Sequence, residues 1–141
     1  MILISACLIG INCRYDGSNS MDTSIIKKIK VEGFIPVCPE QLGGLSTPRP
    51  AASIQNGTGP DVIGSASTVI DMNGRDVTRE FLKGAQEALT IAKLLHVRKA
   101  ILKENSPSCG VNFTSSNFKK IKGIGVFTAM LRNAGIKTCS V

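Results

Sequence analysis

Three of the five cysteines in the chain follow segments that are predicted to be buried strands. Cys7 and Cys38 come directly after two short apolar runs, and Cys109 lies six residues beyond a third. The thiolate is the form of cysteine that binds metal ions. Three thiolates from separate loops can hold three corners of a metal cluster and leave one position free for a substrate. The residues therefore indicate a single metal- or sulfur-handling site.

The cysteine spacing by itself is a weak indication of metal binding. The chain has no Cys-x-x-Cys pair, and each cysteine taken alone is explained as a small buried side chain. Cys13 lies close to Cys7 in the sequence, so a closed zinc site with Cys13 as the fourth ligand is an alternative. Cys139 falls in a predicted strand, where it is expected to pack in the core.

Polar residues next to the cysteines suggest proton transfer at the same place. Glu40 follows Cys38 by two residues, and it is either a solvated loop carboxylate or a proton donor near the thiolates. Ser106 and Ser108 precede Cys109, and they either stabilise a turn or orient a water molecule and a substrate heteroatom. Pro39 and Pro107 restrict the residues before them and so fix the approach to the site.

Strands and helices alternate along most of the chain. Strands are predicted for residues 1–6, 34–37, 97–103 and 136–140, and helices for residues 22–32, 78–95 and 125–134. The first helix has Asp22 or Thr23 as its N-cap, Thr78 caps the long helix, and Gly135 ends the last one. This order predicts an α/β, Rossmann-like, three-layer domain with a central, mostly parallel sheet. Ligands bind beyond the carboxyl ends of such strands, so one crevice should receive all three cysteines.

The segments between these elements include two long predicted loops and a hairpin. Residues 39–60 contain several glycines and prolines and show no periodic pattern, and residues 104–120 are also predicted as a loop. Asn73-Gly74 lies between two short segments predicted as strands, at 69–72 and 75–78. This dipeptide is the strongest short hairpin signal and predicts a β-hairpin insertion.

Length and composition limit the class of protein. The 141 residues match one domain, residues 1–141, and the opening apolar run is too short to span a membrane. An odd number of cysteines without a secretory signal indicates a reducing, cytoplasmic location. The net charge of +7 suits solubility or a phosphate-bearing partner, but one Tyr and no Trp provide little for base stacking along a nucleic acid. The sole histidine, His96, is predicted at the far edge of the sheet, which argues against a histidine-dependent triad.

Three linked motifs make the chain recognisable. They are Ser5–Leu8 with Cys13–Gly17, Cys38–Glu40 with Gly43–Leu45 and Pro48–Pro50, and Ser106–Gly110. Together they resemble the bacterial family that contains 2-thiouracil desulfurase. The resemblance also includes Asp76–Thr78, Phe81, Gly84–Ala85 and Gly123–Gly125, so it extends over nearly the whole chain.

The resemblance implies a [4Fe-4S] cluster and an enzyme that removes sulfur from a small thiolated pyrimidine base or nucleoside. Water would replace the sulfur without net oxidation or reduction. The implied ligands of the cluster are Cys7, Cys38 and Cys109. Glu40 and Ser106 are the expected catalytic residues, and the expected substrate contacts are Ser108, Arg49 and Asn12.

Two other functions remain open from the sequence. The runs Lys27–Lys30 and Lys119–Lys122 would suit a basic module that binds thiolated RNA without turnover, and the zinc domain described above is the second. The chain departs from the family pattern at residues 51–53, which lack an acidic residue, and at residues 113–118, which lack Tyr-Asp-Gly. These departures leave the choice of substrate open.

Overall fold

The computed structural model describes residues 1–141 and contains a four-stranded parallel sheet. Its strands are β1 (Ile2–Ser5), β2 (Phe34–Val37), β5 (Lys99–Leu102) and β8 (Lys137–Ser140), in the spatial order β2-β1-β5-β8. All three neighbouring pairs are parallel. The carboxyl ends of β2, β1 and β5 therefore lie next to one another at one edge of the sheet.

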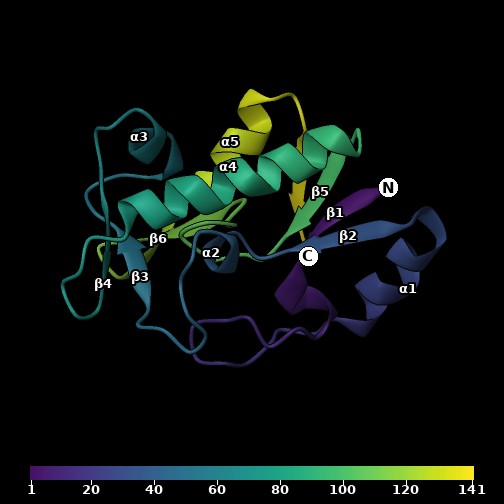
Figure 1. Ribbon diagram of the computed structural model, residues 1–141, viewed down its shortest axis with the longest axis horizontal. Coiled ribbons are helices and arrows are strands. Elements are labelled where there is room, and N and C mark those ends of the chain that lie inside the picture. The colour runs from purple at the N-terminus through teal and green to yellow at the C-terminus, as the bar shows by residue number, and fades with distance from the viewer.

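Helices cover both faces of this sheet. They are α1 (Thr23–Glu32), α4 (Thr78–Leu94) and α5 (Val126–Asn133). Successive residues of β1 point to opposite faces, so Leu3 packs in the cluster that contains Phe81 of α4 and Phe127 of α5, whereas Ile4 packs with Ile29 of α1. Figure 1 shows α4 and α5 above the strands and α1 below them. The predicted three-layer architecture is confirmed.

The helix termini mostly follow the sequence signals. The Asp22 carboxylate caps α1 by accepting the N–H groups of two residues in its first turn, and Gly135 after α5 adopts a φ of 79°. Thr78 was expected to cap α4 but is its first residue. The Asp76 carboxylate accepts the Thr78 N–H, while the Thr78 hydroxyl accepts the N–H of Val69.

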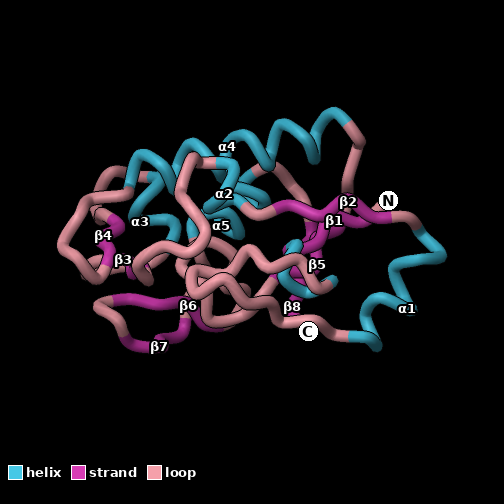
Figure 2. Tube along the Cα trace, turned by 60° about the horizontal axis from the view of Figure 1, so that its bottom comes forward, coloured by secondary structure: helices cyan, strands magenta, loops and turns pink.

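A second sheet takes strands from both segments predicted as loops and from the first strand of the predicted hairpin. Its strands are β3 (Ala52–Ile54), β4 (Val69–Asp71), β6 (Phe113–Ser116) and β7 (Lys119–Lys122), in the order β4-β3-β6-β7. These strands are only three or four residues long and carry polar residues, so they show no clear alternation of apolar and polar side chains in the sequence. Figures 1 and 2 place β3 and β4 at the opposite end of the molecule from β1 and β2.

The hairpin prediction was wrong in one respect. Residues 73–74 do form a turn after β4, but the segment after it makes only a single bridge, between Ile70 and Asp76. The main partner of β4 is β3, with which it pairs antiparallel. The fully paired hairpin is instead β6–β7, whose turn at residues 117–118 lacks the Asn-Gly signature.

Short elements complete the carboxyl edge of the parallel sheet. They are the 3₁₀ helix η1 (Ala6–Ile9), α2 (Pro39–Leu42) and, farther away, α3 (Gly59–Ile63). The helix α2 lies against α4 because Gly43 and Gly84 carry no side chain. A Cβ at Gly84 would overlap the Pro39 carbonyl, and one at Gly43 would overlap the Glu80 carbonyl. None of the helices combines the length and the apolar character that a membrane span requires.

Candidate active site: a cysteine-lined pocket

A pocket of about 390 Å³ lies at the carboxyl edge of the parallel sheet. Its walls come from the ends of β1 and β2, from α2, from the loop 103–109 and from β3 and the β6–β7 hairpin. Cys7, Cys38 and Cys109 line it together with Cys13. The structure therefore brings the three expected cysteines into one cavity and adds a fourth.

The sheet topology explains why these cysteines meet. Cys7 lies in η1 immediately after β1, Cys38 is the N-cap of α2 immediately after β2, and Cys109 follows β5 through a short loop. Because β2, β1 and β5 are adjacent and parallel, their ends bring the three side chains to the same edge. Cys139 lies on β8 outside the pocket, where its thiol donates to the Ala100 carbonyl at 3.6 Å.

The thiols contact one another and lie in an environment that favours their neutral form. A hydrogen bond with Cys38 lowers the pKa of Cys13. A hydrogen bond with Cys7 and burial have the opposite effect and together raise the pKa of Cys13 to about 11. The hydrogen bond with Cys13, then burial, raise the pKa of Cys38. Burial also raises the pKa of Cys109 to about 12, although hydrogen bonds with serine hydroxyls oppose it. A metal centre that bound these thiols as thiolates would therefore release protons.

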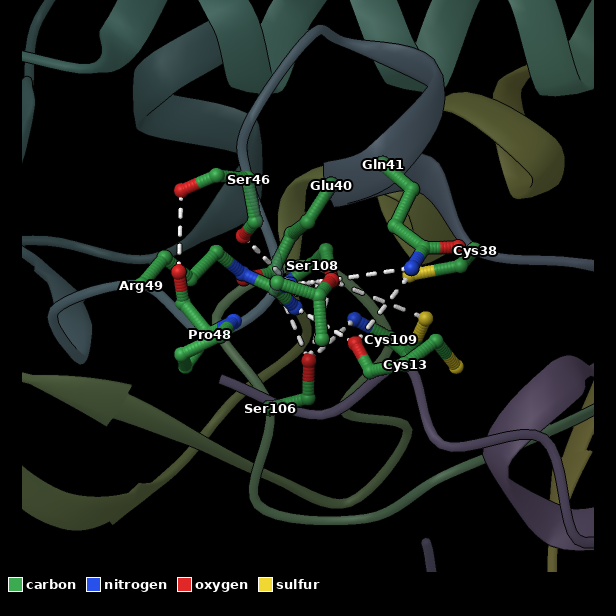
Figure 3. Close-up of polar contacts among 11 residues, drawn as sticks. Cys13, Cys38, Glu40, Gln41, Ser46, Pro48, Arg49, Ser106, Ser108 and Cys109 are labelled. Atoms are coloured by element: carbon green, nitrogen blue, oxygen red, sulfur yellow. Dashed lines mark hydrogen bonds and ion pairs between the residues drawn. The ribbon is translucent and has the colours of Figure 1, made fainter. Parts of the chain in front are cut away.

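Glu40 and two serines form a continuous hydrogen-bonded chain beside the cysteines. The Ser108 hydroxyl donates to Glu40 Oε2 at 3.0 Å and lies 3.0 Å from the Ser106 hydroxyl. It also lies 3.6 Å from Cys109 Sγ. Figure 3 shows this chain next to the sulfur atoms. The arrangement links a carboxylate to the cavity through two hydroxyl groups that both donate and accept protons.

The two serines have different contacts. Ser108 is buried and is the one that contacts Glu40, whereas the Ser106 hydroxyl accepts the N–H groups of Ser108 and Cys109 at 3.2 and 3.0 Å. Ser106 thus stabilises the turn and reaches Glu40 only through Ser108. The resemblance had favoured Ser106 as the catalytic serine and Ser108 as a substrate contact; both side chains line the pocket, but Ser108 is the one next to Glu40.

Arg49 lines the pocket but uses its guanidinium group mainly within the protein. Its Nε pairs with Glu40 Oε1 at 3.2 Å, and its Nη2 donates to the Cys13 carbonyl at 2.9 Å. Only 5% of its side chain is exposed. Asn12, the other expected substrate contact, is exposed, bonds to Asn19 and does not line the pocket. The structure therefore brings Arg49, but not Asn12, to the cysteines.

Sequence reasoning missed Glu104, which orders the loop that carries Cys109. One carboxylate oxygen accepts the backbone N–H groups of Val111, Asn112 and Phe113 at 2.7, 2.8 and 3.0 Å. Burial alone would raise the pKa of Glu104, but these three bonds lower it to about 2. No pattern in the sequence separates this glutamate from an ordinary solvated one.

The donor set consists of cysteine thiols, which are the usual protein ligands of iron–sulfur clusters. No group of three or more His, Cys, Asp or Glu side chains is arranged to hold a single ion. The thiols instead surround a cavity, and they come from three different strand ends. The residues present therefore fit a [4Fe-4S] cluster by their chemistry, with thiols from three strand ends around one pocket.

Comparison with known proteins supports the resemblance drawn from the motifs. The chain is 44% identical over 143 residues to the uncharacterized protein YbbK of Bacillus subtilis (strain 168), covering 99% of this chain and 95% of that protein. A solved structure of a [4Fe-4S]-dependent thiouracil desulfidase, TudS, superposes with a TM-score of 0.85 at 38% identity, covering 99% of this chain and 89% of that one. The model of the 2-thiouracil desulfurase family matches residues 2–141. The chain therefore belongs to the 2-thiouracil desulfurase family, as its motifs predicted.

Proposed function

We propose that this protein is an iron–sulfur-dependent desulfidase that replaces the sulfur of a thiolated pyrimidine base with oxygen from water. The observation that carries the proposal is one pocket in which three thiols from three strand ends face a hydrogen-bonded Glu40–Ser108–Ser106 chain. Family membership and the likeness to TudS support the same reaction class.

In this proposal Cys7, Cys38 and Cys109 hold a [4Fe-4S] cluster. When bound, such a cluster supplies a thiophilic iron without a protein ligand, at which the substrate sulfur can be polarised. Cys13 hydrogen-bonds with two of the proposed ligands, so we assign it the role of a neighbour that shapes the site. The iron site stays open for substrate only if Cys13 is not a fourth ligand.

The reaction conserves electrons and requires proton transfer. A water oxygen forms a bond to the carbon that carries the sulfur, the carbon–sulfur bond breaks, and the two water protons leave with the sulfur as hydrogen sulfide. The carbon changes from a thiocarbonyl to a carbonyl, so no oxidant or reductant is needed. The protein must remove protons from the attacking water and deliver them to the departing sulfur.

Glu40, Ser108 and Ser106 are placed to move these protons. Both Glu40 oxygens accept hydrogen bonds, one from Arg49 and one from Ser108, so the carboxylate is held in direct contact with the Ser108 hydroxyl. Ser108 connects Glu40 to Ser106 on one side and lies beside Cys109 on the other. We therefore propose Glu40 as the general base and the two serines as its relay.

The decisive experiment is anaerobic reconstitution with iron and sulfide, followed by measurement of sulfide released from 2-thiouracil. We expect a brown protein with about four irons per chain, as three thiolates can anchor a cubane cluster. Replacing Cys7, Cys38 or Cys109 with Ala should abolish iron retention. The matched control is Cys139→Ser, since this thiol lies outside the pocket.

Three results would reject the proposal. They are a colourless protein that binds one zinc and resists iron, full iron retention in all three alanine variants, and a loaded protein that binds 2-thiouracil but releases no sulfide. The last result would point to a binding module. Cys13→Ser tests the ligand assignment, because loss of iron in that variant with retention in Cys7→Ala would exchange the roles of the two thiols.

A further inference from the structure

The turn of the β6–β7 hairpin contains an aromatic residue in a conformation that favours glycine. Asn117 and Phe118 are the only residues between the two strands, and their φ angles are 50° and 58°. Positive φ at both central positions defines a type I′ turn, for which Asn-Gly is strongly preferred. Asparagine tolerates this conformation, but a bulky aromatic residue there is a strained outlier.

Local packing does not compensate for the strain at Phe118. Its side chain is 45% exposed, so much of the ring gains nothing from burial. Its backbone N–H donates to Ser53 Oγ at 2.8 Å, a bond that any residue except proline would make. The neighbouring Asn117, in contrast, uses its side chain in two hydrogen bonds with Asn56.

The position of Phe118 suggests what the ring does. Phe118 lines the cysteine pocket, where the only other aromatic residue is Tyr15. The Tyr15 ring lies against the Arg14 guanidinium group, 5.8 Å from ring centre to carbon, and its carbonyl accepts the Arg49 N–H. Both residues are partly exposed, at 42% for Tyr15 and 45% for Phe118, but the Tyr15 ring already contacts Arg14, and only Phe118 has a strained backbone.

We propose that Phe118 stacks on the pyrimidine ring of the substrate and thereby selects planar bases. Strained residues persist where function requires them, and they cluster at ligand sites. Stacking on an aromatic face tolerates any base but needs a flat, unsaturated ring. This inference rests on the proposed function for the identity of the ligand, but it concerns binding and not the chemical step.

The test separates ring stacking from strain relief. Phe118→Gly removes both the ring and the strain, so we expect the melting temperature to rise by about 2–4 °C while KM for 2-thiouracil rises roughly five- to twentyfold. Phe118→Leu keeps the strain but loses the π-face, and it should raise KM similarly without a rise in melting temperature. Phe118→Tyr keeps both and should behave as the wild type. In all three variants kcat and iron content should change less than twofold.

A matched control relieves strain elsewhere. His96, which follows α4 with a φ of 52°, is exposed and outside the pocket. His96→Gly should raise the melting temperature to a similar degree and leave KM unchanged. A rise in KM or a loss of sulfide release in this variant would mean that strain relief alone alters activity, and the interpretation of Phe118→Gly would fail.

Direct binding keeps this inference distinct from the proposed function. Dissociation constants for uracil and 5,6-dihydrouracil are measured by calorimetry on the reconstituted protein, because the two ligands share hydrogen-bonding groups but only uracil is flat. The wild type should prefer uracil, and Phe118→Gly should lose that preference. If the wild type and Phe118→Gly prefer uracil over 5,6-dihydrouracil to the same degree, the stacking role is wrong even if sulfide is released. Preferential binding that depends on Phe118, without sulfide release, keeps the stacking role and rejects the desulfidase.

Discussion

Replacing Glu104 with Gln should loosen the loop that carries Cys109. The carboxylate oxygen Oε1 accepts three consecutive backbone N–H groups, and Oε2 accepts the side-chain amide of Asn112 at 2.9 Å. An amide oxygen can still accept from the backbone, but without a full negative charge. The new NH₂ group would face the Asn112 amide, so two donors would meet and one hydrogen bond would be lost.

The magnitude follows from the pKa of Glu104. A fall from the ordinary value of 4.5 to about 2 corresponds to about 3 kcal/mol at 1.36 kcal/mol per unit. The side chain is partly exposed, so solvent screening reduces this to about 1–2 kcal/mol. Because the pKa is lower in the folded state, the stabilisation is complete above about pH 4.5 and is lost as the pH falls from 4.5 towards 2.

Thermal unfolding of the wild type and of Glu104→Gln at pH 6 and at pH 3 tests this reasoning. At pH 6 the variant should melt about 3–6 °C lower, and at pH 3 the gap should shrink by more than half. Glu87→Gln is the control, since Glu87 is exposed on α4 and its replacement should change nothing. Equal melting temperatures at pH 6, or a gap that persists unchanged at pH 3, would refute the role assigned to the Glu104 charge.

Four further changes test other parts of the structure. Glu40→Gln should lower the rate of sulfide release by roughly 10²–10⁴-fold with iron content unchanged, as expected for the loss of a general base, and Ser108→Ala should have the same effect. A wild-type rate in Glu40→Gln at full iron content would show that Glu40 does not take part in proton transfer. Gly84→Ala should destabilise the fold by about 1–3 kcal/mol in urea unfolding, because its Cβ overlaps the Pro39 carbonyl. Asp22→Ala should lower the free energy of unfolding by about 1 kcal/mol, because α1 loses its N-cap. Unchanged midpoints of urea unfolding in Gly84→Ala and Asp22→Ala would contradict these two predictions.

The arrangement of the cysteines was predictable because it depends on topology more than on detail. Once β1, β2 and β5 are recognised as parallel neighbours, residues that follow each strand must meet at one edge. Cys7 and Cys38 come directly after their strands, so small errors in the strand bounds do not move them away from that edge. The cysteine spacing alone did not identify the family. The three motifs, which occur in the order typical of the family, did.

Details that depend on loop conformation were not predictable from the sequence. The choice between Ser106 and Ser108 depends on how one turn folds, and only the structure shows that Ser108 contacts Glu40. The segment of β4 was predicted as a strand, but β3, β6 and β7 were missed because they are short, carry polar residues and, in the case of β3 and β6, pair over a long sequence distance. The turn at Asn117–Phe118 was missed because phenylalanine is disfavoured at positive φ, so the sequence does not indicate a tight turn there.

Two of the proposed iron ligands have different structural supports from the proposed proton-transfer residues. Cys7 and Cys38 follow strands of a buried sheet, so their positions depend on the core around Leu3, whereas Cys109 shares its loop with the two serines. Glu40 lies instead on α2, which is fixed by its close approach to α4, and the serines lie on the loop ordered by Glu104. A change at Glu40 or Ser108 therefore leaves the strand ends in place. A change at Gly84 would instead displace α2, and a change at Glu104 would loosen the loop that carries Cys109. For this reason loss of activity at full iron content identifies a catalytic group, and parallel loss of iron and stability identifies a supporting one.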